Sequence, residues 1–100
     1  MLVEYSVIPM GKESLSVPVS QVIDIIDKSG LAYQTTSMGT LIEGEWDKIF
    51  SLLKKCHDLL TTNYSRVFEI IRIDERKGAN GRIKGKVDEV EEILKRKIRR

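Results

Sequence analysis

Apolar residues recur along this chain with two different periods. Between Leu2 and Ile8 they alternate with polar residues, as in a half-buried β-strand. In residues 17–29 they are spaced three and four apart, which is typical of an amphipathic helix, and Gly30 is placed to end it. A second helix is predicted over residues 45–62, with an apolar stripe made of Ile49, Leu52, Leu53, Cys56 and Leu60.

The remaining elements follow from shorter patterns. Residues 32–36 and 40–44 are predicted to form a hairpin, because Gly39 between them can adopt a positive φ without steric cost. A fourth strand, a basic loop that contains glycine and a third amphipathic helix are predicted in turn over residues 66–74, 75–85 and 87–98.

This element order predicts an α+β fold. The order β-α-β-β-α-β is the ferredoxin-like arrangement, a four-stranded antiparallel sheet with two helices on one face, here with an extra C-terminal helix. We expect residues 1–100 to form a single domain. Val3, Tyr5 and Val7 are predicted to face the helices.

The other face of the sheet is bare unless something covers it. The strand predicted over residues 66–74 carries apolar residues on both sides, which indicates burial on both sides. We therefore expect a second subunit to cover the open face, giving a homo-oligomer.

Charge is distributed unevenly along the chain. The formal net charge is +2, but residues 72–100 hold eleven basic and six acidic side chains. In residues 88–100 the acidic side chains precede the basic ones, which matches the macrodipole of a solvated helix and argues against a nucleic-acid partner. Binding of an anionic ligand or of nucleic acid by the basic segment 72–86 remains an alternative.

Composition excludes several classes of protein. No apolar run approaches the roughly 20 residues of a membrane span, so no membrane partner is expected. Cys56 is the only cysteine and His57 the only histidine, so neither an intrachain disulfide nor a zinc site is predicted. The N-terminal segment lacks the basic region of a secretory signal, and we expect a cytoplasmic protein.

No catalytic constellation is found. Adjacent helical residues point about 100° apart, so Cys56 and His57 do not form a nucleophile and base, and Cys56 lies on the apolar stripe. Phosphate-loop and dinucleotide-binding glycine patterns are absent from the sequence. We predict a protein that is not an enzyme, with no catalytic residue, cofactor or metal.

Glu43 is the residue whose role needs explanation. It ends the second strand of the hairpin, just before the predicted helix start at residue 45, and strand alternation places it on the bare face near Ser6 or Gln34. A solvated carboxylate at a strand end is the simpler interpretation, since charged residues are mostly exposed. The other interpretation is that Glu43 contacts a ligand.

Several segments together resemble one small family. They cover the chain in order and are Ile8-Pro9-Met10-Gly11, Ser29-Gly30-Leu31-Ala32-Tyr33, Met38-Gly39-Thr40, Glu43-Gly44-Glu45-Trp46, Cys56-His57, Arg66-Val67 and Ile73-Asp74-Glu75-Arg76-Lys77-Gly78. The chain resembles the small thiamine-binding-protein-like family. The resemblance implies a ferredoxin-like protomer in a tetramer built by sheet-to-sheet packing, and binding of thiamine or its hydroxymethylpyrimidine moiety without any reaction.

Binding of this implied ligand requires particular side chains. Thiamine joins a cationic thiazolium to an aminopyrimidine, so it needs a carboxylate or aromatic face for the charge and a donor–acceptor pair for the pyrimidine. Glu43 and Trp46, or Glu4 and Tyr33, could supply the first, although Trp46 is also a natural core or interface aromatic. The candidates for the second are Ser6, Gln34, Thr36, Ser37 and Thr40.

One departure from the family pattern leaves another function open. Ser37 stands where proline often precedes Met-Gly-Thr in the family, which alters the expected hairpin. A structural or regulatory homo-oligomer that binds no ligand is therefore the alternative function.

Overall fold

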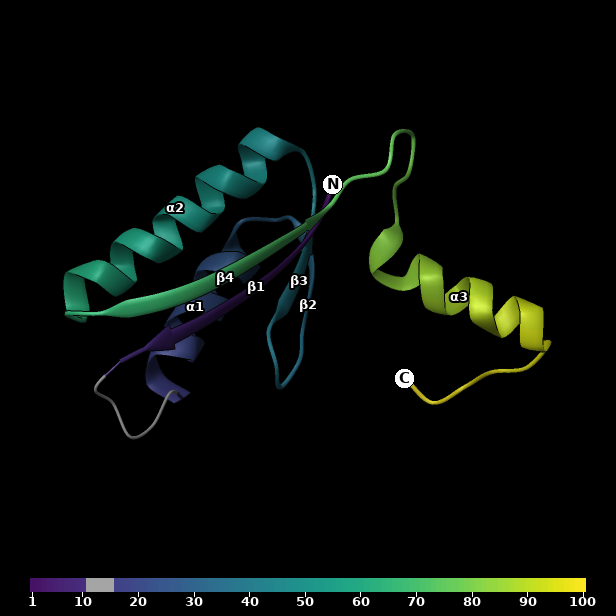
Figure 1. The fold of residues 1–100 in the computed structure, drawn as a ribbon, viewed down its shortest axis with the longest axis horizontal. Coiled ribbons are helices and arrows are strands. Elements are labelled where there is room, and N and C mark those ends of the chain that lie inside the picture. The colour runs from purple at the N-terminus through teal and green to yellow at the C-terminus, as the bar shows by residue number, and fades with distance from the viewer. Residues whose placement is uncertain (11–15) are drawn as a thin grey trace.

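The computed structural model describes residues 1–10 and 16–100 (Figure 1). Its elements, in chain order, are β1 (Leu2–Pro9), α1 (Ser16–Lys28), β2 (Ala32–Thr35), β3 (Thr40–Glu43), α2 (Trp46–Asn63), β4 (Val67–Asp74) and α3 (Arg82–Leu94). The predicted element order is confirmed. The loop predicted between the first strand and the first helix falls on residues 11–15, outside the described residues.

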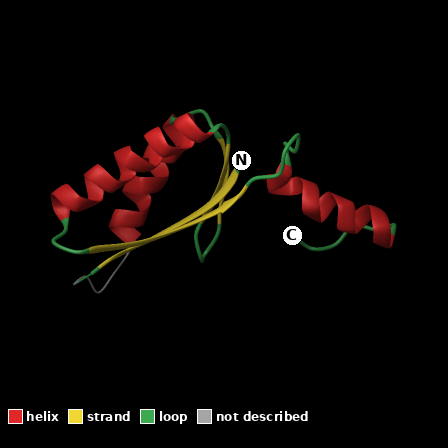
Figure 2. Cartoon of the chain, turned by 45° about the horizontal axis from the view of Figure 1, so that its top comes forward, coloured by secondary structure: helices red, strands yellow, loops and turns green. Residues whose placement is uncertain are grey.

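The four strands form one antiparallel sheet in the order β2-β3-β1-β4. This order, with α1 and α2 on one face of the sheet, is the predicted ferredoxin-like fold (Figure 2). Leu2 lies opposite Glu43 on one side and Asp74 on the other, so these three residues form a row across β3, β1 and β4.

The core lies between the helices and the sheet. Val3 and Tyr5 of β1 are buried there, as predicted. The predicted stripe of α2 is buried in full, and the core comprises Val3, Tyr5, Val22, Ile26, Ile42, Ile49, Leu52, Leu53, Cys56 and Leu60. Within residues 1–10 and 16–100, no helix is long and apolar enough to cross a bilayer.

Gly39 serves a different purpose from the one predicted. Among the described glycines, positive φ occurs at Gly30, Gly78 and Gly81, and not at Gly39. A Cβ atom at residue 39 would lie 3.1 Å from the carbonyl oxygen of Tyr5, closer than nine in ten real Cβ contacts. The hairpin therefore needs glycine because its turn packs against β1. Gly30 ends α1 as expected, with φ of 77°.

The third helix begins five residues earlier than the sequence pattern suggested. α3 starts at Arg82 and ends at Leu94, whereas the apolar period predicted residues 87–98. Gly81, in the left-handed conformation, precedes it, and Lys95, also left-handed, follows it. α3 extends away from α1 and α2 at one end of the sheet, which makes the protomer elongated, 48 × 29 × 21 Å (Figures 1 and 2).

We predicted that β4 is buried on both sides because a second subunit covers the open face, and this stays a prediction. β4 is an edge strand, and apolar side chains are exposed on both of its faces. Phe68 and Ile70 lie opposite Ile8 and Ser6 of β1 on the face that carries no helix. Phe68, Ile70 and Ile8 are 51%, 39% and 41% exposed, so the open face of the protomer holds an exposed apolar cluster.

Candidate functional site

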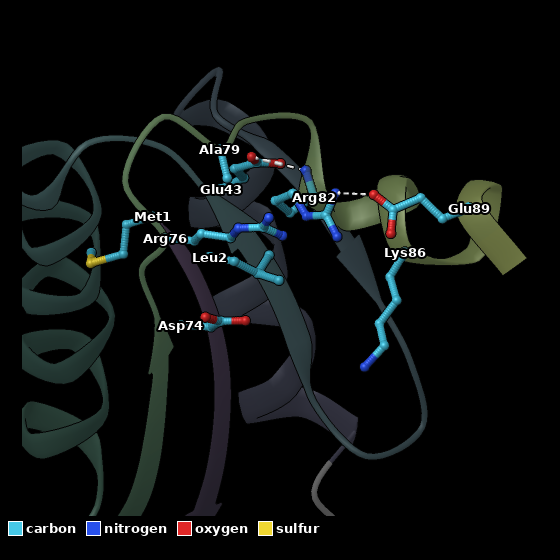
Figure 3. Close-up of a pocket in the computed structure, with 9 residues that line it drawn as sticks. All are labelled: Met1, Leu2, Glu43, Asp74, Arg76, Ala79, Arg82, Lys86 and Glu89. Atoms are coloured by element: carbon cyan, nitrogen blue, oxygen red, sulfur yellow. Dashed lines mark hydrogen bonds and ion pairs between the residues drawn. The ribbon is translucent and has the colours of Figure 1, made fainter.

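A pocket lies at the end of the open sheet face, beneath the start of α3. Its floor is the row Leu2, Glu43 and Asp74, and its volume is about 300 Å³. The loop after β4 and the first turns of α3 supply the other walls, and the lining residues are Met1, Leu2, Glu43, Asp74, Arg76, Ala79, Arg82, Lys86 and Glu89 (Figure 3). This volume is at the lower limit of the range for small-molecule sites, about 300–1,000 Å³.

Glu43 holds the start of α3 in place. The backbone N–H of Arg82 donates to Glu43 Oε2 at 3.0 Å, and that of Ile83 donates to Oε1 at 3.3 Å. Free N–H groups at a helix start favour a negative charge, and Gly81 at the N-cap has no side chain to supply it. The Glu43 carboxylate therefore acts as a cap from a distant strand. A carboxylate has about four acceptor positions, so these two bonds leave room for a ligand donor.

Two charges of the pocket are already paired. Arg82 Nη1 lies 2.9 Å from Glu89 Oε1. This hydrogen bond holds the pKa of Glu89 below its usual value and raises the pKa of Arg82 above its own. Arg76 and Lys86 form no ion pair with any residue in 1–10 or 16–100. Figure 3 shows Arg76 extending from the loop over Leu2 toward Arg82, whereas the Lys86 side chain extends from α3 in a different direction.

The structure brings some of the predicted ligand residues together. Gln34 lies opposite Leu41 on the open face, diagonal to Glu43, where side chains are roughly 7–8 Å apart. Ser6 shares this face but is four residues along β1 from the partner of Glu43, roughly 13 Å away. Gln34 is thus near Glu43 within one protomer, whereas Ser6 is near the hairpin turn.

The other predicted residues lie outside the pocket. Thr36 closes the hairpin turn, with its hydroxyl accepting from the N–H groups of Met38 and Gly39. Ser37 is exposed in the same turn. Thr40 is buried on the helix-covered face, where its hydroxyl lies 3.0 Å from that of Thr35.

Trp46 takes a separate position at the start of α2. Trp46 is 53% exposed, and the centroid of its ring lies 4.4 Å from the centroid of the Phe50 ring. This contact fits the simpler interpretation of Trp46 as a packing aromatic.

Sequence reasoning did not assign the remaining polar side chains of the pocket. Arg76, Arg82 and Lys86 belong to the basic segment considered for an anionic ligand, and Asp74 and Arg76 also belong to the run from Ile73 to Gly78 that resembles the family. Glu89 was not considered as a site residue. In the fold, this segment is not a uniformly basic surface, because the row on the sheet and α3 place carboxylates among its cations. Arg72, which belongs to the same segment, forms an ion pair with Glu4, in which Arg72 Nη1 lies 3.7 Å from Glu4 Oε1.

A second polar cluster joins α2 to the sheet. The hydroxyl of Tyr5 donates to Glu69 Oε1 at 2.6 Å, and His57 Nδ1 lies 2.7 Å from Glu69 Oε2. Burial and then the Glu69 carboxylate raise the pKa of Tyr5 above its ordinary value. Cys56 is fully buried, and burial raises the pKa of its thiol to about 11, which fits the predicted core role.

Comparison with known proteins places the chain in a family. A sequence model of the thiamine-binding protein family matches residues 3–91. The chain belongs to the thiamine-binding protein family. Curated relatives include the UPF0045 protein MJ1052 of Methanocaldococcus jannaschii, 34% identical over 94 residues, covering 93% of this chain and 94% of the relative. The UPF0045 protein YqgV of Bacillus subtilis is 31% identical over 100 residues, covering 93% and 96%.

Solved structures of similar length share the fold. The crystal structure of the Methanocaldococcus jannaschii protein has a TM-score of 0.82 and 35% identity, covering 91% of this chain and 95% of that one. A Thermotoga maritima protein, provisionally named for thiamine biosynthesis or salvage, has a TM-score of 0.79 at 23% identity, covering 89% and 96%. At that identity the second similarity supports the fold alone.

Proposed function

We propose that this protein binds thiamine or its hydroxymethylpyrimidine moiety without transforming it, and that the Glu43 pocket is the binding site. The observation that carries the proposal is the Glu43 carboxylate in a pocket of small-molecule size, in a chain that matches the thiamine-binding protein family. The name of the Thermotoga maritima structure is consistent with it.

The chemistry of the pocket fits a cationic aminopyrimidine ligand. Glu43 and Asp74 lie on either side of Leu2, so two carboxylates flank an apolar side chain. A carboxylate can accept from the exocyclic amine of the pyrimidine or balance the thiazolium charge, while Leu2 contacts the flat ring. Gln34, diagonal to Glu43, offers both a donor and an acceptor to a ligand that extends along the sheet.

The proposal includes a homo-oligomer, a tetramer built by packing the open sheet faces together. The exposed apolar cluster of Ile8, Phe68 and Ile70 supports this, because burying it removes apolar surface from water. A partner would also extend the pocket, since the open face continues from Glu43 toward Ser6.

Calorimetric titration tests the proposal. The protein is unfolded and refolded to remove any bound ligand, and then titrated in parallel with thiamine and with hydroxymethylpyrimidine. Saturable binding of either is expected. Glu43→Gln should weaken it about tenfold or more, because it replaces a charge-assisted acceptor with a neutral amide.

Glu45→Gln is the matched control. Glu45 is exposed two residues further along, and its side chain makes no cap hydrogen bond to α2. The Glu45→Gln variant should bind the ligand with the same affinity as the parent protein. Circular dichroism of Glu43→Gln must show that α3 persists, since Gln can still accept one of the two helix N–H groups. Unchanged affinity in Glu43→Gln removes Glu43 from the site.

A structural or regulatory oligomer without ligand is the second candidate. The exposed apolar face favours it independently of the pocket, since that face implies a partner and not a small molecule. No heat with either ligand, together with a stable tetramer in analytical ultracentrifugation, would favour this second function over the first.

A further inference from the structure

β4 forms one edge of the sheet, and no strand in the described part of the chain pairs with its outer side (Figure 1). It is eight residues long, whereas β2, the strand at the opposite edge, has four. Its register with β1 is continuous from Val67 to Asp74, so no bulge interrupts it, and it contains neither proline nor lysine. Bulges, prolines and lysines are devices by which natural proteins block pairing at an edge. β4 is therefore open to a further strand.

The hydrogen-bond pattern shows which residues of β4 face that edge. The N–H of Met10 donates to the carbonyl oxygen of Arg66 at 2.8 Å, which extends the ladder between β1 and β4 by one residue. Residues of an antiparallel strand direct their N–H and C=O groups to alternate sides, so the even-numbered residues of β4 bond to β1. The odd-numbered residues, which direct their backbone groups to the free edge, are Val67, Glu69, Ile71 and Ile73.

Side chains on both faces of β4 lack cover in the protomer. Packing of the open faces can bury the apolar cluster of the open face. Ile71 and Ile73 lie on the other face, and they are 40% and 45% exposed. They are opposite Tyr5 and Val3 of the core, yet packing of the open faces leaves them in water. A strand laid along the edge of β4 would cover side chains on both faces.

One register makes β4 complementary to a second copy of itself. When Ile70 lies opposite its own copy on a two-fold axis, Phe68 lies opposite Arg72. In the same register Arg66 lies opposite Asp74, and in residues 1–10 and 16–100 neither of these charges forms an ion pair. The first pair places a guanidinium beside an aromatic ring, and the second places opposite charges together.

The same register satisfies the helix side of β4 and its backbone. Val67 lies opposite Ile73 of the second copy, and Glu69 lies opposite Ile71. Each of these residues directs its backbone groups to the free edge, so all of those groups gain partners.

Neighbouring registers lack this complementarity. A register centred on Ile71 places Phe68 opposite the Asp74 carboxylate. Registers centred on Glu69 or on Arg72 place like charges directly opposite each other, which is destabilising.

From this complementarity we infer that β4 pairs with β4 of a second copy of the chain, antiparallel and centred on Ile70, so that two protomers share one continuous sheet. Arg66 of the second copy then lies beside Asp74, at the end of the row that floors the Glu43 pocket, and so adds a side chain to the candidate site. This interface goes beyond the proposed function, which uses only the open faces. Two copies packed by their open faces about a two-fold axis form a closed pair, so the proposed tetramer needs a second interface, and the β4 edge supplies it.

A disulfide between copies tests the register. A variant with both Val67→Cys and Ile73→Cys places thiols opposite each other, with about 5.5 Å between Cα atoms, within the disulfide range of roughly 4.4–6.8 Å. Residues 67 and 73 of one strand are about 20 Å apart, so the bond must join two copies. Mild oxidation should give a covalent dimer on a non-reducing gel. Both positions lie on the helix side, so packing of the open faces cannot produce this bond, and the natural Cys56 is fully buried.

The matched control carries Val67→Cys and Ile71→Cys. It has the same number of thiols on the same face, but each lies two residues away from the position opposite it in the proposed pair. It should give no covalent dimer.

Charge reversal tests the contact between Arg66 and Asp74. Arg66→Asp or Asp74→Arg alone puts like charges opposite each other, and each should weaken association about tenfold in analytical ultracentrifugation at low salt. The double variant restores opposite charges and should associate within about threefold of the parent. Arg99→Asp is the control for net charge, because Arg99 is exposed in the C-terminal segment beyond α3. It should associate as the parent does.

Each outcome supports or overturns the inference. A covalent dimer of the variant at residues 67 and 73, with rescue in the charge-reversed double variant, supports it. An oligomer that does not cross-link assigns association to the open faces and overturns it, and a cross-link in the control overturns the register. A monomer with an intact sheet by circular dichroism also overturns it, and leaves the edge to a strand of another protein. Thiamine binding without β4 pairing leaves the proposed ligand standing, so the two failures are distinguishable.

Discussion

The hydrogen bond between Tyr5 and Glu69 gives the sharpest stability test of this fold. Tyr5 is 2% exposed in the core, and its hydroxyl donates to the carboxylate of Glu69 at 2.6 Å. Glu69 also holds His57 of α2, so the three side chains tie β1, β4 and α2 together. Tyr5→Phe keeps the ring in the core and removes only the donor.

The magnitude follows from the surroundings of the carboxylate. A hydrogen bond to a charged group contributes about 1.5–3 kcal/mol to stability. The Glu69 side chain is 18% exposed and keeps His57 after the substitution, so water can replace part of what is lost. We therefore expect Tyr5→Phe to lower the free energy of unfolding by about 1–2 kcal/mol.

Glu69→Ala should cost more, because it leaves the buried hydroxyl of Tyr5 without its acceptor and releases His57. A loss of about 2–3 kcal/mol is expected, since an unsatisfied buried polar group adds its desolvation cost. In the double variant the hydroxyl is absent, so the two losses should not add, and the coupling should be about 1 kcal/mol.

Urea unfolding at one fixed protein concentration measures these differences, since dissociation of an oligomer would otherwise contribute to them. His57→Ala is the control for the exposed arm of the cluster, and it should cost less than Glu69→Ala. If Tyr5→Phe is as stable as the parent, or if the losses in the double variant are additive, the hydrogen bond is not the source of the stability assigned to it.

Three further predictions test other parts of the structure. Because burial raises the pKa of Cys56 to about 11, its thiol should react with a disulfide reagent at pH 8 far more slowly in the native protein than in urea, and equal rates would contradict its burial. The side chain of Arg100 and the backbone N–H of Ile98 hold the pKa of Glu91 at about 2, so this stabilisation is complete above pH about 4.5 and is lost as pH falls toward 2. The protection factors of amide hydrogens near the end of α3 should fall over this pH range. In Glu91→Gln these protection factors should no longer depend on pH. Gly39→Ala should cost about 1–3 kcal/mol in thermal or urea unfolding, since its Cβ would press on the carbonyl of Tyr5, and a neutral effect would show that the hairpin can shift.

The sequence by itself determined most of the fold, because periodicity reports burial directly. The stripe of α2 from Ile49 to Leu60 and the alternation of β1 are local patterns with one compatible geometry each, and the structure confirms both. The start of α3 was misplaced because its first turn has little apolar periodicity. Glu43, 39 residues from Arg82, supplies the charge that caps this turn, and no local pattern records such a contact.

The candidate site depended on the tertiary structure. Strand alternation put Glu43 on the open face, but only the register showed that it lies beside Leu2, in the same row as Asp74, and not beside Ser6. The course of the chain after β4 then brought Arg76 and Lys86 to that row. Periodicity acts between neighbours in sequence, whereas a pocket joins side chains from several elements, so the sequence predicted the elements and the tertiary structure decided which of their charges meet.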